Sequence, residues 1–159
     1  MDLILWRHAE AELAGIGMSD AARKLTGKGI KQAAKMALWL DSTLPDTCRV
    51  LVSPALRTRD TAEALAARGR KIKLVNELQV DSSPLQALEA ANWPNSREPV
   101  LLVGHQPYLG QIVSFLLHMP MHEVAIKKGN IWWISQKQDE DGSSKIYLKA
   151  VMAPELVLK

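Results

Sequence analysis

The sequence predicts an α/β protein: a single-domain three-layer sandwich in which helices cover both faces of a mixed, mostly parallel sheet. Two features indicate this class. Short apolar runs alternate with segments of helical periodicity, which is the pattern of parallel strands joined by crossover helices. Near the end of the chain, residues 131–135 and 146–152 instead flank an acidic turn, which is typical of a hairpin at one side of such a sheet.

The composition fits one globular domain, and residues 1–159 are expected to form it. Hydrophobic residues make up 47% of the chain and charged residues 23%, which is ordinary for this class. No apolar run approaches the ~20 residues of a membrane span, so no membrane association is expected. Cys48 is the only cysteine, which excludes an internal disulfide and favours a reducing, cytoplasmic location.

The net charge of +3 suits an anionic ligand. The densest cluster of cations surrounds Gly69 and contains Arg68, Arg70, Lys71 and Lys73. A nucleic-acid surface would favour a basic stripe with stacking aromatic residues. We therefore interpret the cluster as a solvated helix end and expect no nucleic-acid partner.

The first strand is predicted at residues 3–6, where four apolar residues in a row indicate burial on both faces. Arg7 and His8 follow at once, at the carboxyl edge of the sheet, where open α/β sheets bind ligands. Arg7 is a permanent cation whose planar fork of donors suits phosphate or carboxylate. His8 can act as base, acid or nucleophile near neutral pH.

The next segment, residues 9–24, is long for a loop in a compact domain, and such loops are usually functional or mobile. Thr26 is positioned to cap a helix that runs to about Leu40. The apolar spacing predicts that one face of this helix is buried. The expected members of that face are Leu25, Ile30, Ala33, Ala34, Ala37 and Leu38.

The second strand is predicted at residues 49–52. Ser53 and Pro54 then form a typical helix start, with serine as the cap and proline in the first helical position. Gly69 ends this helix, and a third strand at residues 72–75 follows it.

The fourth strand is predicted at residues 100–103, a run of only valine and leucine. It follows a helix that begins after Ser83 and must end before Pro94. Gly104 and His105 come directly after the strand, so a second histidine is expected at the carboxyl edge.

Right-handed crossovers place the first, second and fourth strands side by side, with their carboxyl ends on one edge. Arg7, His8, Arg57 and His105 then meet there beside two helix amino termini, which together form a strong anion site. Gly104 has no side chain and leaves room for the close approach of a ligand. Each charge-assisted hydrogen bond contributes roughly 1.5–3 kcal/mol, so a dianionic phosphoryl group is the favoured ligand.

Simpler interpretations compete with this one. A lone histidine after a strand is more often a hydrogen-bonded structural residue than a catalyst. An arginine in the first helical turn is usually solvated, but Arg57 opposes the helix dipole there unless an anion is bound. His118 and His122 have the spacing of one helical face, but Pro120 breaks that helix, so no metal site is expected.

Three segments together resemble the motifs of the histidine phosphatase superfamily, which includes phosphoglycerate mutases. Arg7-His8-Ala9 is similar to its Arg-His-Gly signature, with alanine as a small replacement for glycine. Residues 53–62 resemble the second motif and residues 103–107 the third, in the family's order and over nearly the whole chain. The short length, and Arg23 shortly before Thr26, are most similar to the small SixA-type phosphohistidine phosphatases.

The resemblance implies a phosphoglycerate mutase-like fold and a phosphatase that needs no metal or other cofactor. His8 is then the nucleophile, and Arg7, Arg57 and His105 grip the phosphoryl oxygens. Glu77 lies where larger members of the family carry a carboxylate general acid. The residues expected to bind substrate are Arg23, Glu77 and Gly104.

For the substrate, the resemblance implies phosphohistidine on a protein, such as a histidine-phosphorylated signalling or transfer domain. Few residues remain for a lid, which suits a side chain presented by another protein. Two alternatives stay open: a phosphatase for small phosphate esters with the same mechanism, and a non-catalytic phosphate-binding module. A histidine beside two arginines counts against the module, because a binding protein needs no nucleophile.

Overall fold

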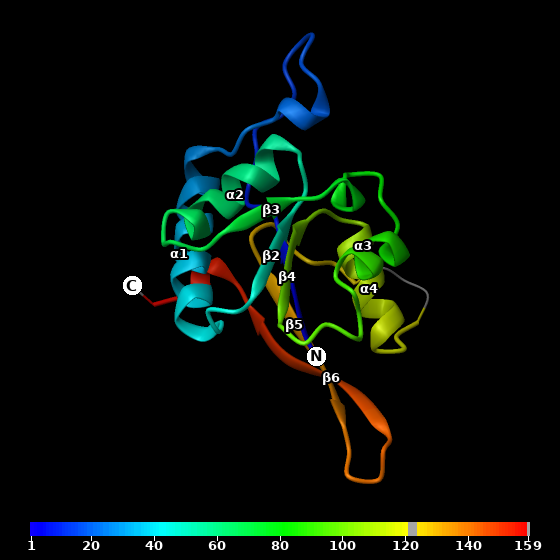
Figure 1. Ribbon diagram of the computed structural model, residues 1–159. Helices are drawn as coiled ribbons and strands as arrows, with labels where there is room; N and C mark the ends of the chain where they lie inside the picture. Colours follow the sequence, from blue (N-terminus) through cyan, green and yellow to red (C-terminus); the bar gives the residue numbers. More distant parts are fainter. Residues whose placement is uncertain (121–123, 159) are drawn as a thin grey trace.

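The computed structural model describes residues 1–120 and 124–158. Its six strands form one sheet in the order β3-β2-β4-β1-β5-β6 (Figure 1). The four strands from β3 to β1 pair in parallel, and β5 and β6 extend the sheet antiparallel. The predicted mixed, mostly parallel sheet is therefore confirmed. The strands are β1 (Asp2–Arg7), β2 (Arg49–Val52), β3 (Ile72–Leu74), β4 (Val100–Gly104), β5 (Ile131–Gln138) and β6 (Ser144–Met152).

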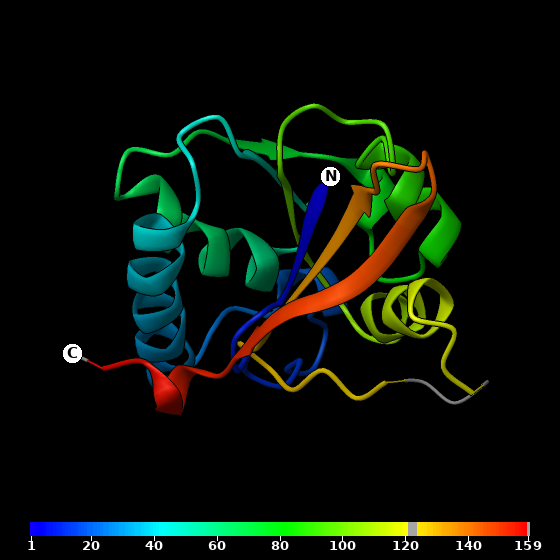
Figure 2. The same ribbon diagram turned by 90° about the horizontal axis from the view of Figure 1, so that it is seen from below.

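Helices cover both faces of the sheet and complete the three layers (Figure 2). Alternate residues of each central strand point to opposite faces, so Ile4 and Trp6 pack with the helices α1 and α2, and Leu3 and Leu5 pack with α3 and α4. None of the described helices is long and apolar enough to span a bilayer. The α-helices are α1 (Gly27–Thr43), α2 (Leu56–Ala66), α3 (Pro84–Ala90) and α4 (Tyr108–Leu116), and short 3-10 helices lie at Asp20–Ala22, Asn76–Leu78 and Pro154–Leu156.

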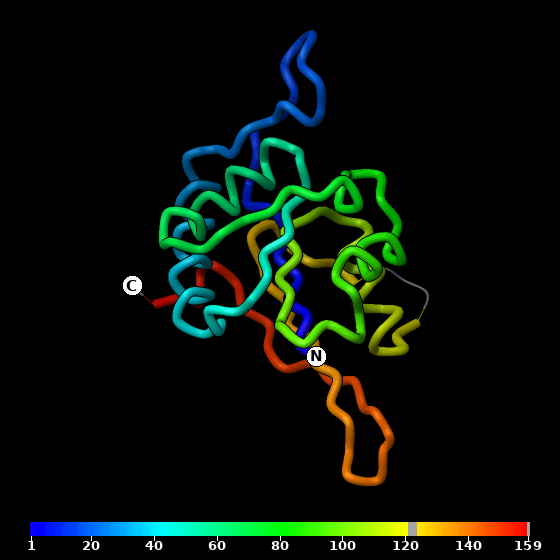
Figure 3. Tube along the Cα trace, in the orientation of Figure 1, coloured from blue at the N-terminus to red at the C-terminus, as the bar shows by residue number. Residues whose placement is uncertain are grey.

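Two segments extend beyond this body at opposite ends of the molecule (Figure 3). One is the long loop between β1 and α1, and the other is the predicted hairpin, in which β5 and β6 pair antiparallel. The loop leaves the sheet at the carboxyl end of β1, so it lies on the same side of the fold as the predicted ligand edge.

The predicted start of α1 is confirmed, because the Thr26 hydroxyl accepts a hydrogen bond from the Gly29 amide at 3.0 Å. The predicted buried face is partly wrong: Ile30 is 60% exposed and Leu38 39% exposed. Gly29 sets the rotation of the helix, because a Cβ there would overlap the backbone carbonyl of Glu10. The side that faces the core is shifted accordingly and consists of Gly29, Ala33, Met36, Ala37 and Leu40.

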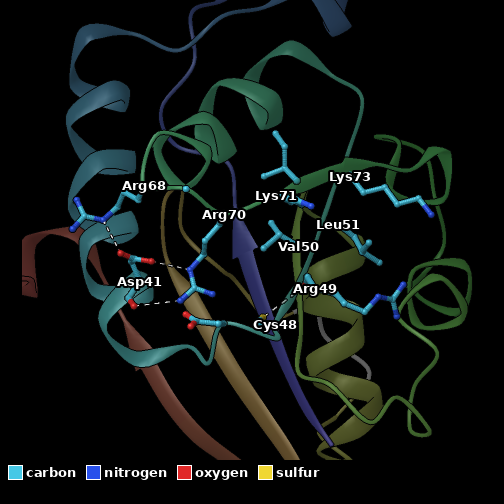
Figure 4. A pocket seen from close by; sticks show the side chains of 12 residues that line it. Asp41, Cys48, Arg49, Val50, Leu51, Arg68, Arg70, Lys71 and Lys73 are labelled. Carbon is cyan, nitrogen blue, oxygen red and sulfur yellow. Dashed lines mark hydrogen bonds and ion pairs between the residues drawn. The ribbon is translucent and has the colours of Figure 1, made fainter.

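The basic cluster around Gly69 is only partly the solvated helix end that the sequence indicates. Arg70 has a side chain that is 9% exposed and donates to the Asp41 carboxylate at 2.9 Å and to the Leu44 carbonyl at 2.8 Å. It therefore ties the end of α1 to the chain after α2 (Figure 4). Lys71 and Lys73 are exposed beside a hollow of about 540 Å³ at the amino ends of β2 and β3, away from the predicted ligand edge.

Gly104 packs closely against the phenol ring of Tyr108. Its absent side chain makes room for Tyr108, whose hydroxyl donates to the Leu78 carbonyl at 2.6 Å and would overlap a Cβ at position 104. The room expected for a ligand beside Gly104 is therefore filled by Tyr108.

Gly104→Ala should destabilise the fold by about 1–3 kcal/mol, because both the backbone and the phenol are buried and cannot yield freely. Denaturant unfolding of Gly104→Ala, Tyr108→Phe and the double variant tests this packing. Removing the hydroxyl relieves part of the overlap, so the double variant should lose less stability than the two single losses added together. Strict additivity would contradict the contact.

Candidate active site

The ends of β1, β2 and β4 bring the predicted residues together. These strands are neighbours in the sheet, and Arg7 pairs with Gly104 in register. The His8 amide donates to the Gly104 carbonyl at 3.1 Å, which continues the pairing past the last residue of β1. As a result the rings of His8 and His105 lie with their centroids 5.4 Å apart.

His8 is a buried, neutral imidazole with one nitrogen committed. Its Nδ1 lies 2.8 Å from the Ala9 carbonyl oxygen, which can only accept, so Nδ1 carries the proton and Nε2 keeps a lone pair. Burial lowers the pKa of His8 to about 4, and the positive charges of Arg57 and Arg7 act in the same direction. A neutral ring with Nε2 free is the form of histidine that can attack phosphorus.

Two guanidinium groups flank His8, and each is anchored through its terminal nitrogens. Arg7 donates from Nη1 to the Ile126 carbonyl at 2.8 Å. Arg57 donates from Nη1 to the Asp20 carbonyl and from Nη2 to the Asp20 carboxylate, both at 2.9 Å. Burial lowers the pKa of Arg7, and repulsion from the like charge of Arg57 adds to the effect. The Nε atoms of both residues are buried and find no acceptor among the described residues.

His105 is held by Ser53, which the sequence predicts to be a helix cap. The helix predicted to begin at Pro54 begins at Leu56, and Ser53 gives it no cap. Instead the Ser53 hydroxyl lies 2.7 Å from Nε2 of His105 and receives the Ala55 amide hydrogen at 3.4 Å. Among the described residues this hydroxyl hydrogen has no acceptor other than Nε2 of His105, so we assign the hydrogen of the contact to Ser53.

His105 is also a neutral ring. Burial lowers its pKa to about 3, with Arg57 contributing in the same direction. Because Ser53 donates to Nε2, the ring proton belongs on Nδ1, which is buried and without a partner among the described residues.

Three buried nitrogens at this edge therefore lack acceptors within the described chain: Nε of Arg7, Nε of Arg57 and Nδ1 of His105. Leaving a buried donor unsatisfied costs about 1–3 kcal/mol, and more for a charged group. A phosphoryl group supplies three acceptor oxygens and negative charge together. The arrangement fits a phosphoryl ligand held beside Nε2 of His8.

Asp20 joins the site although no pattern in the sequence points to it. Its carboxylate lies 2.9 Å from Arg57 and 3.1 Å from Arg23, and these hydrogen bonds and charges lower the pKa of Asp20. The positive end of the α2 dipole favours an anion beside Arg57. The Asp20 carboxylate of the long loop is part of that negative charge. An aspartate among other polar loop residues carries no spacing signal, so only the folded structure identifies it.

The other predicted binding residues lie further from this cluster. Arg23 donates from Nε to the Glu12 carbonyl at 2.7 Å and is tied into the loop, although its charge still acts on His8. Glu77 is exposed on the 3-10 helix Asn76–Leu78 and makes no hydrogen bond or ion pair with the described residues. It neither joins the cluster nor fastens its own loop.

The structure describes one of the two histidines whose spacing suggests a metal site. His118 lies after the end of α4, and His122 lies outside the described residues. Across residues 1–120 and 124–158, no group of three or more His, Cys, Asp or Glu side chains could hold a metal ion.

The comparisons with known proteins agree with this geometry. Residues 3–79 match the model of the histidine phosphatase superfamily (branch 1). A phosphohistidine phosphatase SixA from Escherichia coli is 31% identical over 73% of this chain and 74% of its own length. A SixA homologue from Haemophilus influenzae is 29% identical over 94% of this chain and all of its own. A solved structure of the protein histidine phosphatase SixA with tungstate is 27% identical, covers 97% of each chain and has a TM-score of 0.75.

The chain belongs to the histidine phosphatase superfamily, which confirms the resemblance of its three motifs. Within that superfamily it falls in the SixA-type branch, as the short length of the chain and the SixA relatives indicate.

We expect ¹⁵N NMR of His8 to show a neutral ring protonated on Nδ1 at pH 7, with the first protonation of Nε2 near pH 4. Burial and the neighbouring guanidinium groups disfavour the imidazolium ion. The His8→Gln variant assigns the signal. An imidazolium ring at pH 6, or a proton on Nε2 at pH 7, would contradict the tautomer derived from the Ala9 contact.

Proposed function

We propose that this protein is a metal-independent phosphatase that removes phosphate from phosphohistidine on another protein, with residues 1–159 acting as one catalytic domain. The observation that carries the proposal is the fixed Nδ1–H tautomer of His8 beside three buried nitrogens without acceptors. The kinship with proteins named phosphohistidine phosphatases supports the choice of substrate.

In the first step, Nε2 of His8 attacks the phosphorus atom of the substrate in line with the bond that breaks. The new bond is P–Nε2, and the bond that breaks joins phosphorus to the substrate imidazole. With a proton already on its other ring nitrogen, that imidazole leaves as a neutral ring and keeps the electron pair of the broken bond. Arg7, Arg57 and His105 donate to the non-bridging oxygens while charge develops on them. Such positioned donors supply most of the catalysis in phosphoryl transfer.

In the second step, water attacks the phosphorus atom carried by His8. The P–Nε2 bond breaks, inorganic phosphate leaves, and the lone pair returns to Nε2. The Ala9 carbonyl holds Nδ1–H throughout, so the same tautomer is restored for the next cycle. Two guanidinium groups provide the positive charge that metal ions provide in other phosphatases, so the described residues complete the reaction themselves.

The chemistry of the leaving group favours phosphohistidine. An imidazole has a conjugate-acid pKa of about 6.5 and leaves with little help, whereas an alkoxide requires a general acid. The carboxylate that contacts the site, Asp20, is engaged by Arg57 and Arg23 and is poorly placed to give up a proton. A non-catalytic phosphate-binding module has no use for a histidine whose tautomer is fixed for attack.

His8→Ala should abolish turnover, with a loss of at least about a thousandfold, while the protein stays folded. After incubation with a labile phosphoryl donor, wild type should carry acid-labile, alkali-stable phosphate and the variant none. His118→Asn is the matched control, because asparagine tolerates the positive φ of 52° at that position. Label that survives in His8→Ala would place the nucleophile elsewhere.

Glu77→Gln separates phosphohistidine from a small phosphate ester as the substrate, because only an alkoxide needs a strong general acid. The exposed, unpaired carboxylate of Glu77 is the feature that keeps the ester alternative open. We expect the change to slow phosphohistidine cleavage by less than about tenfold, below the 10²–10⁴-fold range of a general acid. Rates on a phosphohistidine peptide and on a panel of esters give the answer. A hundredfold loss on the peptide, with the fold intact, would refute the proposed leaving group.

A further inference from the structure

A hollow of about 380 Å³ opens beside Arg7 and continues the active site along the surface. Four cations line it against two carboxylates, so it is a basic surface. Its lining residues are Arg7, Glu10, Lys28, Gln32, Lys127, Lys128, Asn130 and Glu155.

Lys127 and Lys128 are carried by a segment that is bonded on both sides to the end of β1. Before them, the Ile126 carbonyl accepts from the Arg7 side chain at 2.8 Å. After them, the Gly129 amide donates to the carbonyls of Arg7 and His8 at 3.1 and 3.0 Å. The two lysines are therefore held at a fixed place beside the nucleophile, although their side chains are exposed.

Lys28 is fixed in the same way from the other side of the hollow. It follows Thr26, whose amide donates to the Glu10 carbonyl at 3.0 Å, and precedes Gly29, which packs on the Glu10 backbone. Glu10 is two residues beyond His8, so the start of α1 and the active-site strand end form one rigid unit.

These lysines have no counter-ions among the described residues. Some exposed lysines elsewhere on the surface are paired, as Lys145 is with Asp139 and Lys149 with Asp2. Lys28, Lys127 and Lys128 form no ion pair or side-chain hydrogen bond with residues 1–120 or 124–158. A second hollow of about 800 Å³ shares Lys28 with the first and carries Lys31 and Lys35 along α1.

We propose that Lys28, Lys127 and Lys128, the lysine rim, bind acidic side chains that lie beside the phosphohistidine on the substrate protein. The inference rests on the proposed function and adds to it the charge of the partner's surface. An extended partner fits better than a second phosphate on a small molecule, because the basic surface runs on past the first hollow to Lys31 and Lys35. Complementary charges at such a rim mainly raise the rate of association and fix the orientation of the bound partner.

Three synthetic peptides that differ only in their flanking residues test the rim. Each carries one central phosphohistidine, made with phosphoramidate, between glutamates, glutamines or lysines. Because the phosphoryl group is common to all three, the ratio of their kcat/KM values reports the flanks alone. At about 0.01 M ionic strength the wild type should prefer the glutamate peptide over the glutamine peptide by roughly fivefold, and about 1 M salt should remove the preference.

Lys127→Glu/Lys128→Glu should reverse the order, so that the lysine peptide becomes the better substrate through a lower KM with kcat nearly unchanged. Lys71→Glu/Lys73→Glu is the matched control: it makes the same change of charge beside the hollow at the amino ends of β2 and β3 and should keep the wild-type order. All four lysines are exposed, so the variants should fold normally, and thermal unfolding checks this.

Equal kcat/KM values for the three peptides in wild type, or a reversal in the Lys71→Glu/Lys73→Glu control, would contradict the proposed role of the lysine rim. Neither result would contradict the proposed phosphatase activity. Binding of the unphosphorylated glutamate peptide, followed by fluorescence anisotropy, reads the rim without catalysis. If that peptide binds through Lys127 and Lys128 while no phosphohistidine peptide is hydrolysed, the rim holds and the proposed function fails.

Discussion

The hydrogen bond from His8 to the Ala9 carbonyl is the constraint on which the chemistry of this site depends. It is possible only because Ala9 is itself fixed: its amide donates to the Thr61 hydroxyl at 3.0 Å, and that hydroxyl donates to the Arg57 carbonyl at 2.7 Å. One turn of α2 thus sets both the orientation of the His8 ring and the position of the Arg57 guanidinium. The spacing between Arg57 and Thr61 in the sequence is the spacing of one helical turn, so both act from the same side of α2.

The site also makes the fold sensitive to acid. The pKa values of His8 and His105 in the folded protein, about 4 and about 3, lie below the value of about 6.5 expected in the unfolded chain. Above pH 6.5 both states carry neutral rings and the stabilisation is complete. As the pH falls below 6.5, these histidines bind protons in the unfolded chain but not in the folded chain. The free energy of unfolding therefore declines until the pH reaches the pKa values of the folded protein. The buried, cation-rich environment that keeps the His8 ring neutral is the cause of this loss.

The strands and the approach of Arg7, His8, Arg57 and His105 could be predicted because each depends on a local signal. A run of apolar residues buried on both faces marks a central strand, and parallel neighbours share their carboxyl edge. The predictions that are wrong concern features that depend on contacts between segments distant in the sequence. The rotation of α1 follows from Gly29 meeting the Glu10 backbone, and Ser53 leaves its expected helix cap because His105 lies within reach. No periodicity in the sequence contains such facts.

Catalysis and the basic surface beside it share one framework. The hydrogen bonds that join residues 126–130 to Arg7 and His8 orient the Arg7 side chain, and the same bonds hold Lys127 and Lys128 at the rim. On the opposite side of the nucleophile the long loop presents Asp20, whose charge is already matched by Arg57 and Arg23. Lys28, Lys127 and Lys128, which form no ion pair with the described residues, lie in the hollow beside Arg7 together with two carboxylates, Glu10 and Glu155. On the loop side, the cations Arg57 and Arg23 are paired with Asp20. Under the proposed function, acidic residues on one side of the phosphohistidine give the substrate protein a single orientation, which in-line attack by Nε2 requires.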